Sequence, residues 1–256
     1  MSIHDRSSGG IRRIFWAVPL DKAVRETVSA ACRTLKGMAP FRRWTHPEDY
    51  HITLIFLGET EEEAIPAIVR AAGEAAARHA PFSLRLGGPG TFGGGGGAGA
   101  GAGSGSGLVP GSGAGFGAGL GLGTGSGSGS GSGLGSGPRA GAGRAAPPRV
   151  LWFGVEGERD KLAALQRDLS AVHEPFGYRP ERRPYTPHIT VARQGERPPL
   201  HPLPRTLQEL LPGSPSGEPR TPSAPGWEVR RIVLYETRMG QSPMYKELAA
   251  LPLGSG

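Results

Sequence analysis

Apolar positions in the first ninety residues follow two periods, a period of two that is typical of strands and a spacing of three and four that is typical of helices. Strands are expected at 11–18, 43–45, 51–57 and from 82 onward, and helices at 21–37 and 60–79. The second helix is expected to start at the acidic residues 61–63, because carboxylates are favoured in the first turn of a helix. Gly58 is expected to end the strand before it.

The same periods return after residue 148. Strands are expected at 149–155, 188–192, 227–235 and 245–251, and helices at 158–172 and, more briefly, at 206–211. The longer helix has three leucines on one face, at 162, 165 and 169. The order strand, helix, strand thus occurs in both halves of the chain, which is consistent with an internal duplication.

A glycine-rich tract separates the two halves. Residues 93–137 hold 24 of the 44 glycines and no charged residue, so the remaining 211 of the 256 residues have an ordinary globular composition. Glycine alternates there with Ser or Ala, which excludes a collagen repeat, and no Gly-Lys-Ser/Thr sequence follows that would indicate a phosphate loop. We expect a flexible insertion at 93–137 and a proline-rich loop at 196–226, which contains nine prolines.

Charge and cysteine content narrow the class of protein. The formal net charge is +7, and 25 of the 29 basic residues are arginines, which suits an anionic partner but also follows from GC-rich coding. The single cysteine, Cys32, cannot form an internal disulfide, and the apolar run 14–20 is too short to span a membrane. We expect a soluble, cytoplasmic protein that acts as a monomer without an obligate protein partner and without a membrane association.

Two short motifs carry the candidate chemistry, at 51–54 (HITL) and 188–191 (HITV). Side chains alternate between the faces of a strand, so the His and the Thr of each motif project together while the aliphatic residues face the core. Seven histidines and 12 threonines would give about 0.3 such triplets by chance. A strand histidine can also be a satisfied, half-buried side chain, but the pairing across two similar halves favours a functional site.

The residues beside these motifs restrict the chemistry. Neither motif supplies the further ligand that a zinc site needs, and a threonine two residues from a histidine on one strand is poorly placed as a nucleophile. Two imidazoles instead suit general acid–base catalysis on a phosphodiester, with the hydroxyls holding the non-bridging oxygens, and this chemistry requires neither a metal nor a cofactor. The other five histidines lack a hydroxyl two residues on and are expected at the surface; they are His4, His46, His79, His173 and His201.

The paired motifs resemble those of the 2H phosphoesterase superfamily, and in particular its bacterial and archaeal RNA 2′,3′-cyclic phosphodiesterase group, also called 2′-5′ RNA ligase-like. Further stretches that resemble this family are 14–18 (IFWAV), 51–58 (HITLIFLG), 150–155 (VLWFGV), 185–193 (YTPHITVAR), 233–237 (VLYET) and the chain from Tyr245. The resemblance implies an α+β fold over 11–256, a single domain of two pseudo-symmetric lobes whose antiparallel sheets face a central cleft, with the helices outside.

The resemblance also implies roles for individual residues. His51 would donate a proton to the leaving 3′ oxygen, His188 would activate water, and Thr53 and Thr190 would bind the phosphate. The substrate would be RNA with a 2′,3′-cyclic phosphate end, the product a 2′-phosphomonoester, and RNA joining in the reverse direction is also known of the family.

Three further residues each have two alternative roles, and the protein as a whole has two alternative functions. Arg193 either contacts the phosphate or is a solvated residue at a strand end, while Phe56 and Tyr185 either stack on a base or pack in the core. A small cyclic nucleotide, such as ADP-ribose 1″,2″-cyclic phosphate, is an alternative substrate. A nucleotide-binding module without turnover is the alternative from another class.

Overall fold

The strands and helices of the chain alternate as the sequence patterns predict. A computed structural model describes residues 10–93, 146–198, 202–211 and 225–254. Its strands are β1 (Ile11–Pro19), β2 (Phe41–Trp44), β3 (His51–Glu61), β4 (Phe82–Phe92), β5 (Val150–Gly157), β6 (His188–Gly195), β7 (Gly226–Val229), β8 (Arg231–Thr237) and β9 (Tyr245–Pro252). Its helices are α1 (Lys22–Met38), α2 (Ile65–Ala76) and α3 (Arg159–His173), with short 3-10 turns at Pro47–Asp49 (η1), Glu62–Ala64 (η2), Glu174–Phe176 (η3) and Gln208–Leu210 (η4).

The strands form two antiparallel groups that meet at one point. The order is β7-β4-β5-β6-β3-β1-β8-β9, and β2 adds to the edge of β6. The first lobe is therefore β3-β1-β8-β9 and the second is β7-β4-β5-β6 with β2. The α+β fold of two lobes that the resemblance implies is confirmed, with each lobe supplying one of the two motif strands.

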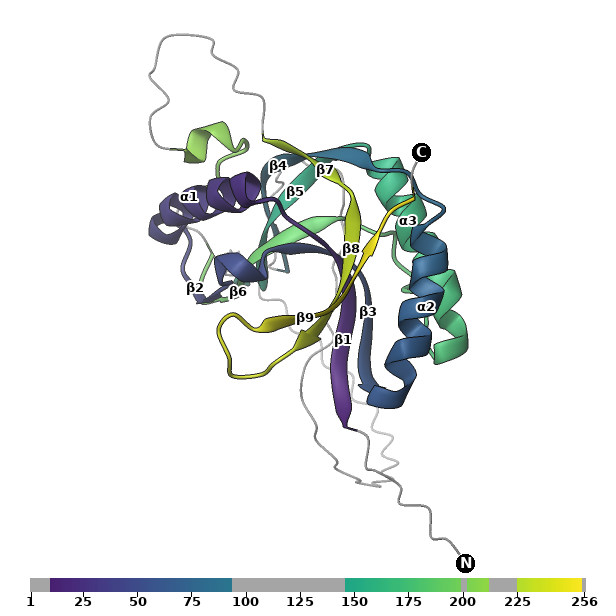
Figure 1. Cartoon of the computed structure of the whole chain (residues 1–256). Helices are drawn as coiled ribbons and strands as arrows, with labels where there is room; N and C mark the ends of the chain where they lie inside the picture. The colour runs from purple at the N-terminus through teal and green to yellow at the C-terminus, as the bar shows by residue number, and fades with distance from the viewer. Residues whose placement is uncertain (1–9, 94–145, 199–201, 212–224, 255–256) are drawn as a thin grey trace, which may run out of the picture.

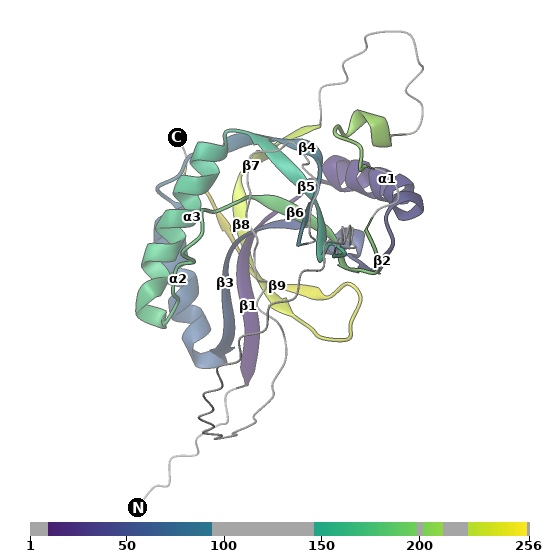
Figure 2. The same ribbon diagram turned by 180° about the vertical axis from the view of Figure 1, so that it is seen from behind.

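The helices flank the strands on two sides. In Figures 1 and 2, α1 lies on one side of the strands while α2 and α3 lie side by side on the other. Each helix buries an apolar stripe, and the three leucines of α3 at 162, 165 and 169 are fully buried, as their spacing predicts. No helix in the described part of the chain is long and apolar enough to cross a membrane.

Several elements differ from their predicted bounds, and two of these differences affect how the strands are arranged. The strand β3 continues through Gly58, which has a φ of 80°, to Glu61, so the acidic residues 61–63 precede the α-helix α2 instead of forming its first turn. The segment 227–235, predicted as one strand, is two strands that break at Arg230. The break lets β7 pair with β4 in the second lobe while β8 pairs with β1 in the first.

The two strands that flank the glycine-rich tract pair with each other. Phe92 at the end of β4 pairs with Val150 at the start of β5, and the Arg149 amide donates to the Phe92 carbonyl at 2.8 Å. Of the predicted insertion 93–137, all but Gly93 lies outside the described residues, as do 199–201 and 212–224 of the predicted loop 196–226. The predicted helix at 206–211 is the 3-10 turn η4.

His173 is buried, which corrects the expectation that it lies at the surface. Its Nε2 accepts a hydrogen bond from the Trp16 indole at 3.1 Å, and its Nδ1 donates to the Leu169 carbonyl at 2.6 Å. Burial lowers the pKa of His173, so the ring is neutral at neutral pH. His79 is partly buried and bonds Asp168 of α3, whereas His46 is exposed as predicted; His4 and His201 lie outside the described residues.

We expect this burial to make the fold sensitive to acid. In the unfolded chain, His173 takes up a proton as the pH falls through about 6.5, whereas the folded ring takes it up only at a lower pH. The free energy of unfolding is therefore highest above pH 6.5 and decreases as the pH falls from there toward the pKa of the folded ring. Urea unfolding between pH 5 and 8 should show a smaller loss on acidification in His173→Gln, whose amide oxygen can still accept from Trp16. His46→Gln is the exposed control, and an unchanged slope in His173→Gln would contradict this account.

Candidate active site

One residue pair joins the two lobes and brings the two motifs together. Ile52 of β3 pairs with Ile189 of β6, and both side chains are fully buried. Because the pairing is antiparallel, His51 comes opposite Thr190 and Thr53 comes opposite His188. Residues opposite one another, and residues two apart on a strand, share a face, so the four side chains form a square on the face away from the two isoleucines.

Matching β-bulges extend this square at both ends. Each motif strand carries one extra residue, between 53 and 55 in β3 relative to β1 and between 190 and 192 in β6 relative to β5. The two residues after each threonine are both buried, and the next one is exposed: Phe56 in β3 and Arg193 in β6. A bulge changes the facing of the residues that follow it, so Phe56 and Arg193 lie on the face of the histidines.

The two imidazoles are held in the same way. His51 Nδ1 lies 2.7 Å from the Asp49 carbonyl, and His188 Nδ1 lies 2.8 Å from the Thr186 carbonyl. A carbonyl only accepts, so Nδ1 carries the proton in both rings and each Nε2 is left with a lone pair in the neutral form. The Nε2 of His51 accepts from the Thr53 hydroxyl at 3.1 Å. Both Nε2 atoms can therefore take or give a proton at the site face.

Aromatic rings surround both histidines. The His51 ring has its centroid 4.9 Å from that of Phe15 and 5.1 Å from that of Tyr245. The His188 ring contacts Phe92 at 5.0 Å and lies 6.3 Å from Trp152. These rings remove water from the imidazoles and hold them in one orientation, a role that the alternation of apolar positions alone did not predict.

The same surroundings set the protonation of the pair. Burial, together with the positive charge of Arg193 and the neighbouring His188, lowers the pKa of His51 to about 4, against the Asp49 carbonyl, which raises it. Burial also lowers the pKa of His188, again with Arg193 acting in the same direction. Arg193 is thus close enough to act on both histidines, and without an anion both rings are neutral at neutral pH.

Asp49 links the site to the last strand. Its carboxylate is buried and accepts from the Met244 amide at 2.9 Å and the Tyr245 amide at 3.0 Å, at the start of β9. The same residue supplies the carbonyl that holds His51. Asp49 is not among the residues that the sequence patterns single out. Its position two residues before the motif histidine, matched by Thr186 before His188, is the signal that would have found it.

Tyr185 and Phe56, the two candidates for stacking on a base, have different surroundings. The Tyr185 hydroxyl donates to the Thr53 carbonyl at 2.9 Å, which makes it a support for the motif strand. Phe56 is 37% exposed, and the Arg13 guanidinium lies 5.0 Å from its ring centroid. Among the described residues, no group of three or more His, Cys, Asp or Glu side chains could hold a metal ion.

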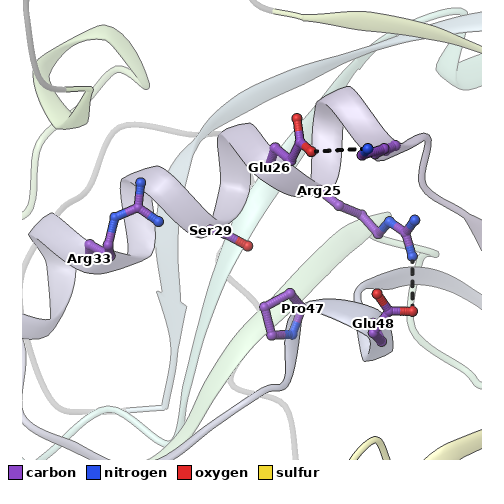
Figure 3. Close-up of a pocket in the computed structure, with 7 residues that line it drawn as sticks. Arg25, Glu26, Ser29, Arg33, Pro47 and Glu48 are labelled. Atoms are coloured by element: carbon purple, nitrogen blue, oxygen red, sulfur yellow. Dashed lines mark hydrogen bonds and ion pairs between the residues drawn. The ribbon is translucent and has the colours of Figure 1, made fainter.

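A pocket of about 330 Å³ lies between α1 and η1 (Figure 3). Its charges largely pair with one another, Arg25 with Glu48 at 3.5 Å and Lys22 with Glu26 at 3.9 Å. The pocket is therefore closer to neutral than its basic residues suggest.

Comparison with known proteins gives a family and several relatives. The family model described as LigT like Phosphoesterase matches residues 18–98 and 153–245, and so includes both motifs. An RNA 2′,3′-cyclic phosphodiesterase of Geobacillus stearothermophilus is 32% identical over 241 residues, which is 93% of this chain but only 56% of that protein. A Bacillus subtilis protein of the same name is 24% identical, over 91% of this chain and 92% of its own length.

Solved structures share the fold. The crystal structure of E. coli LigT complexed with 3′-AMP superimposes with a TM-score of 0.59 over 95% of this chain and 99% of its own, at 20% identity. A Thermus thermophilus protein, TT0787, gives a TM-score of 0.55 over 95% of this chain and 98% of its own, at 23% identity.

Proposed function

Because this chain belongs to the LigT-like phosphoesterase family, we propose that it hydrolyses the 2′,3′-cyclic phosphodiester ends of RNA to 2′-phosphomonoesters. The observation that carries the proposal is the Ile52–Ile189 pair, which sets one His-x-Thr motif against the other on a single face. The names of the Geobacillus and Bacillus relatives support the same substrate.

The proposed reaction is one in-line displacement at phosphorus. The Nε2 of His188 takes a proton from water, whose oxygen attacks the phosphorus, and the bond from phosphorus to O3′ breaks. The Nε2 of His51 gives its proton to O3′, so the product carries a 2′-phosphate and a 3′-hydroxyl. Thr53, Thr190 and Arg193 hold the non-bridging oxygens, where the negative charge is concentrated.

The lowered pKa values of His51 and His188 raise the question of how His51 becomes protonated. His51 must be protonated to act as donor, yet its surroundings lower its pKa to about 4. The phosphate of the substrate is negative and offsets the charge of Arg193, so its binding favours a protonated imidazole. We expect substrate binding to be accompanied by proton uptake, with no metal needed to supply the charge.

Incubation of a defined RNA bearing a 2′,3′-cyclic end, with and without EDTA, tests the proposal. We expect equal cleavage in both conditions and a 2′-phosphate as the product, because the donor side chain serves O3′ and no metal takes part. The 2′- and 3′-phosphate isomers are separated by chromatography against standards. A 3′-phosphate product, or activity that EDTA removes, would overturn the mechanism.

A further inference from the structure

Two arginines face each other across the β2–β6 pair. Arg43 of β2 lies directly opposite Arg193 of β6, and both side chains are exposed. Residues directly opposite on antiparallel strands project from the same face, and like charges in that position destabilise the pair. Within the described parts of the chain, neither guanidinium forms a hydrogen bond or an ion pair with a carboxylate.

The neighbouring arginine behaves differently. Arg42 projects from the opposite face of β2, and its Nε donates to Glu196 at 3.1 Å. The acidic partner that neutralises Arg42 is thus absent from the Arg43–Arg193 face. An arginine pair without a carboxylate binds an anion well, because two planar guanidinium groups can each donate to phosphate oxygens.

The position of this pair relative to the histidines indicates which anion it binds. Arg193 follows Thr190 after the bulge in β6 and lies on the face of the histidines, so it borders the square of histidines and threonines. Arg43 lies one strand farther out, on the side of β6 opposite β5. A phosphate held by the square therefore has Arg193 beside it and Arg43 beyond it.

We propose that Arg43, with Arg193, forms a second phosphate subsite that binds the phosphodiester on the 5′ side of the terminal nucleotide. The inference rests on the proposed function and specifies its substrate: a polynucleotide is favoured over a cyclic mononucleotide, because only the polynucleotide carries this second phosphodiester. Arg43 thereby selects the substrate and takes no part in bond breaking.

Kinetics on two substrates test this subsite. For a 2′,3′-cyclic oligonucleotide, Arg43→Gln should raise KM about tenfold more than for the matching 2′,3′-cyclic mononucleotide, with little change in kcat for either substrate. The slope of log KM for the oligonucleotide against log salt concentration should fall by about 0.7, the change expected for one lost contact to a single-stranded phosphate. Arg42→Gln is the matched control, since it removes an adjacent arginine on the other face.

The outcomes separate the subsite from the proposed reaction. Equal effects of Arg43→Gln on both substrates, no effect on either, or the same selectivity change in Arg42→Gln would overturn the subsite. If the wild-type protein cleaves neither substrate, the reaction itself fails. Binding of an oligonucleotide with a 2′-phosphate end, followed by fluorescence anisotropy in the wild type and both variants, then still measures the role of Arg43.

Discussion

Replacing either motif histidine with alanine is expected to lower the turnover of a 2′,3′-cyclic oligonucleotide by about 10²–10⁴-fold, the contribution typical of a positioned general acid or base. His51 and His188 come from different lobes but share one face, and in each neutral ring Nε2 carries the lone pair because a carbonyl binds the protonated Nδ1. In the proposed mechanism neither ring can substitute for the other, because proton removal and proton donation are expected on opposite sides of the phosphorus. The double variant should therefore be little worse than either single variant.

The pH dependence of kcat distinguishes the two roles. A donor must be protonated and an acceptor neutral, so the wild-type profile should be bell-shaped. His51→Ala should lose the alkaline limb, and His188→Ala should lose the acidic limb. Loss of the opposite limb in each variant would reverse the two roles, since a histidine with the low pKa of His51 is suited to act as the proton acceptor.

A substrate with an activated leaving group gives an independent measurement. A nucleoside p-nitrophenyl phosphodiester needs no proton on its leaving oxygen, so His51→Ala should lose far less activity on it than His188→Ala does. His79→Gln serves as the control, because His79 bonds Asp168 between the outer helices. Wild-type turnover of the cyclic substrate by either alanine variant would contradict the shared site.

Asp49→Ala is expected to lower the free energy of unfolding by about 2–4 kcal/mol and to lower activity as well. The buried carboxylate accepts from the amides of Met244 and Tyr245, and a buried amide without a partner costs about 1–3 kcal/mol. Release of these amides also frees Tyr245, whose ring contacts His51 at 5.1 Å between centroids. A stability loss and a catalytic loss should thus arise from one side chain.

Urea unfolding and steady-state kinetics measure the two effects. Glu48→Ala is the matched control, since Glu48 precedes Asp49 but its side chain is 63% exposed, and an exposed ion pair contributes about 0–1 kcal/mol. Asp49→Asn keeps one oxygen acceptor and should recover part of both losses. If Asp49→Ala unfolds like the wild type, the carboxylate does not anchor β9.

The part of the site that follows from local periodicity was predictable from the sequence. Alternation along a strand places the His and Thr of each motif together, and the structure has both motifs on strands with the aliphatic residues buried. The bulges were not predictable, because an extra residue is defined only relative to the partner strand. Strict alternation would turn Arg193 away from Thr190, and it is the bulge that restores it to the same face.

Long-range contacts account for the other differences. His173 was expected at the surface because it has no hydroxyl two residues on, yet Trp16, 157 positions earlier, supplies the donor that allows its burial. The division of 227–235 into two strands depends on which lobe each part pairs with, and Arg230 alone carries no sign of it. Local propensity sets the type of an element, whereas its ends and partners are set by tertiary contacts.

The exchange of strands between the lobes has a consequence for how the two halves of the chain depend on each other. The half before the glycine-rich tract supplies β4 to the second lobe, and the half after it supplies β8 and β9 to the first. The lobes are therefore interlocked, and neither half can complete a sheet by itself. A chain cut within the tract would yield two fragments whose association and folding are one event, with the square of histidines and threonines forming only in the reassembled pair.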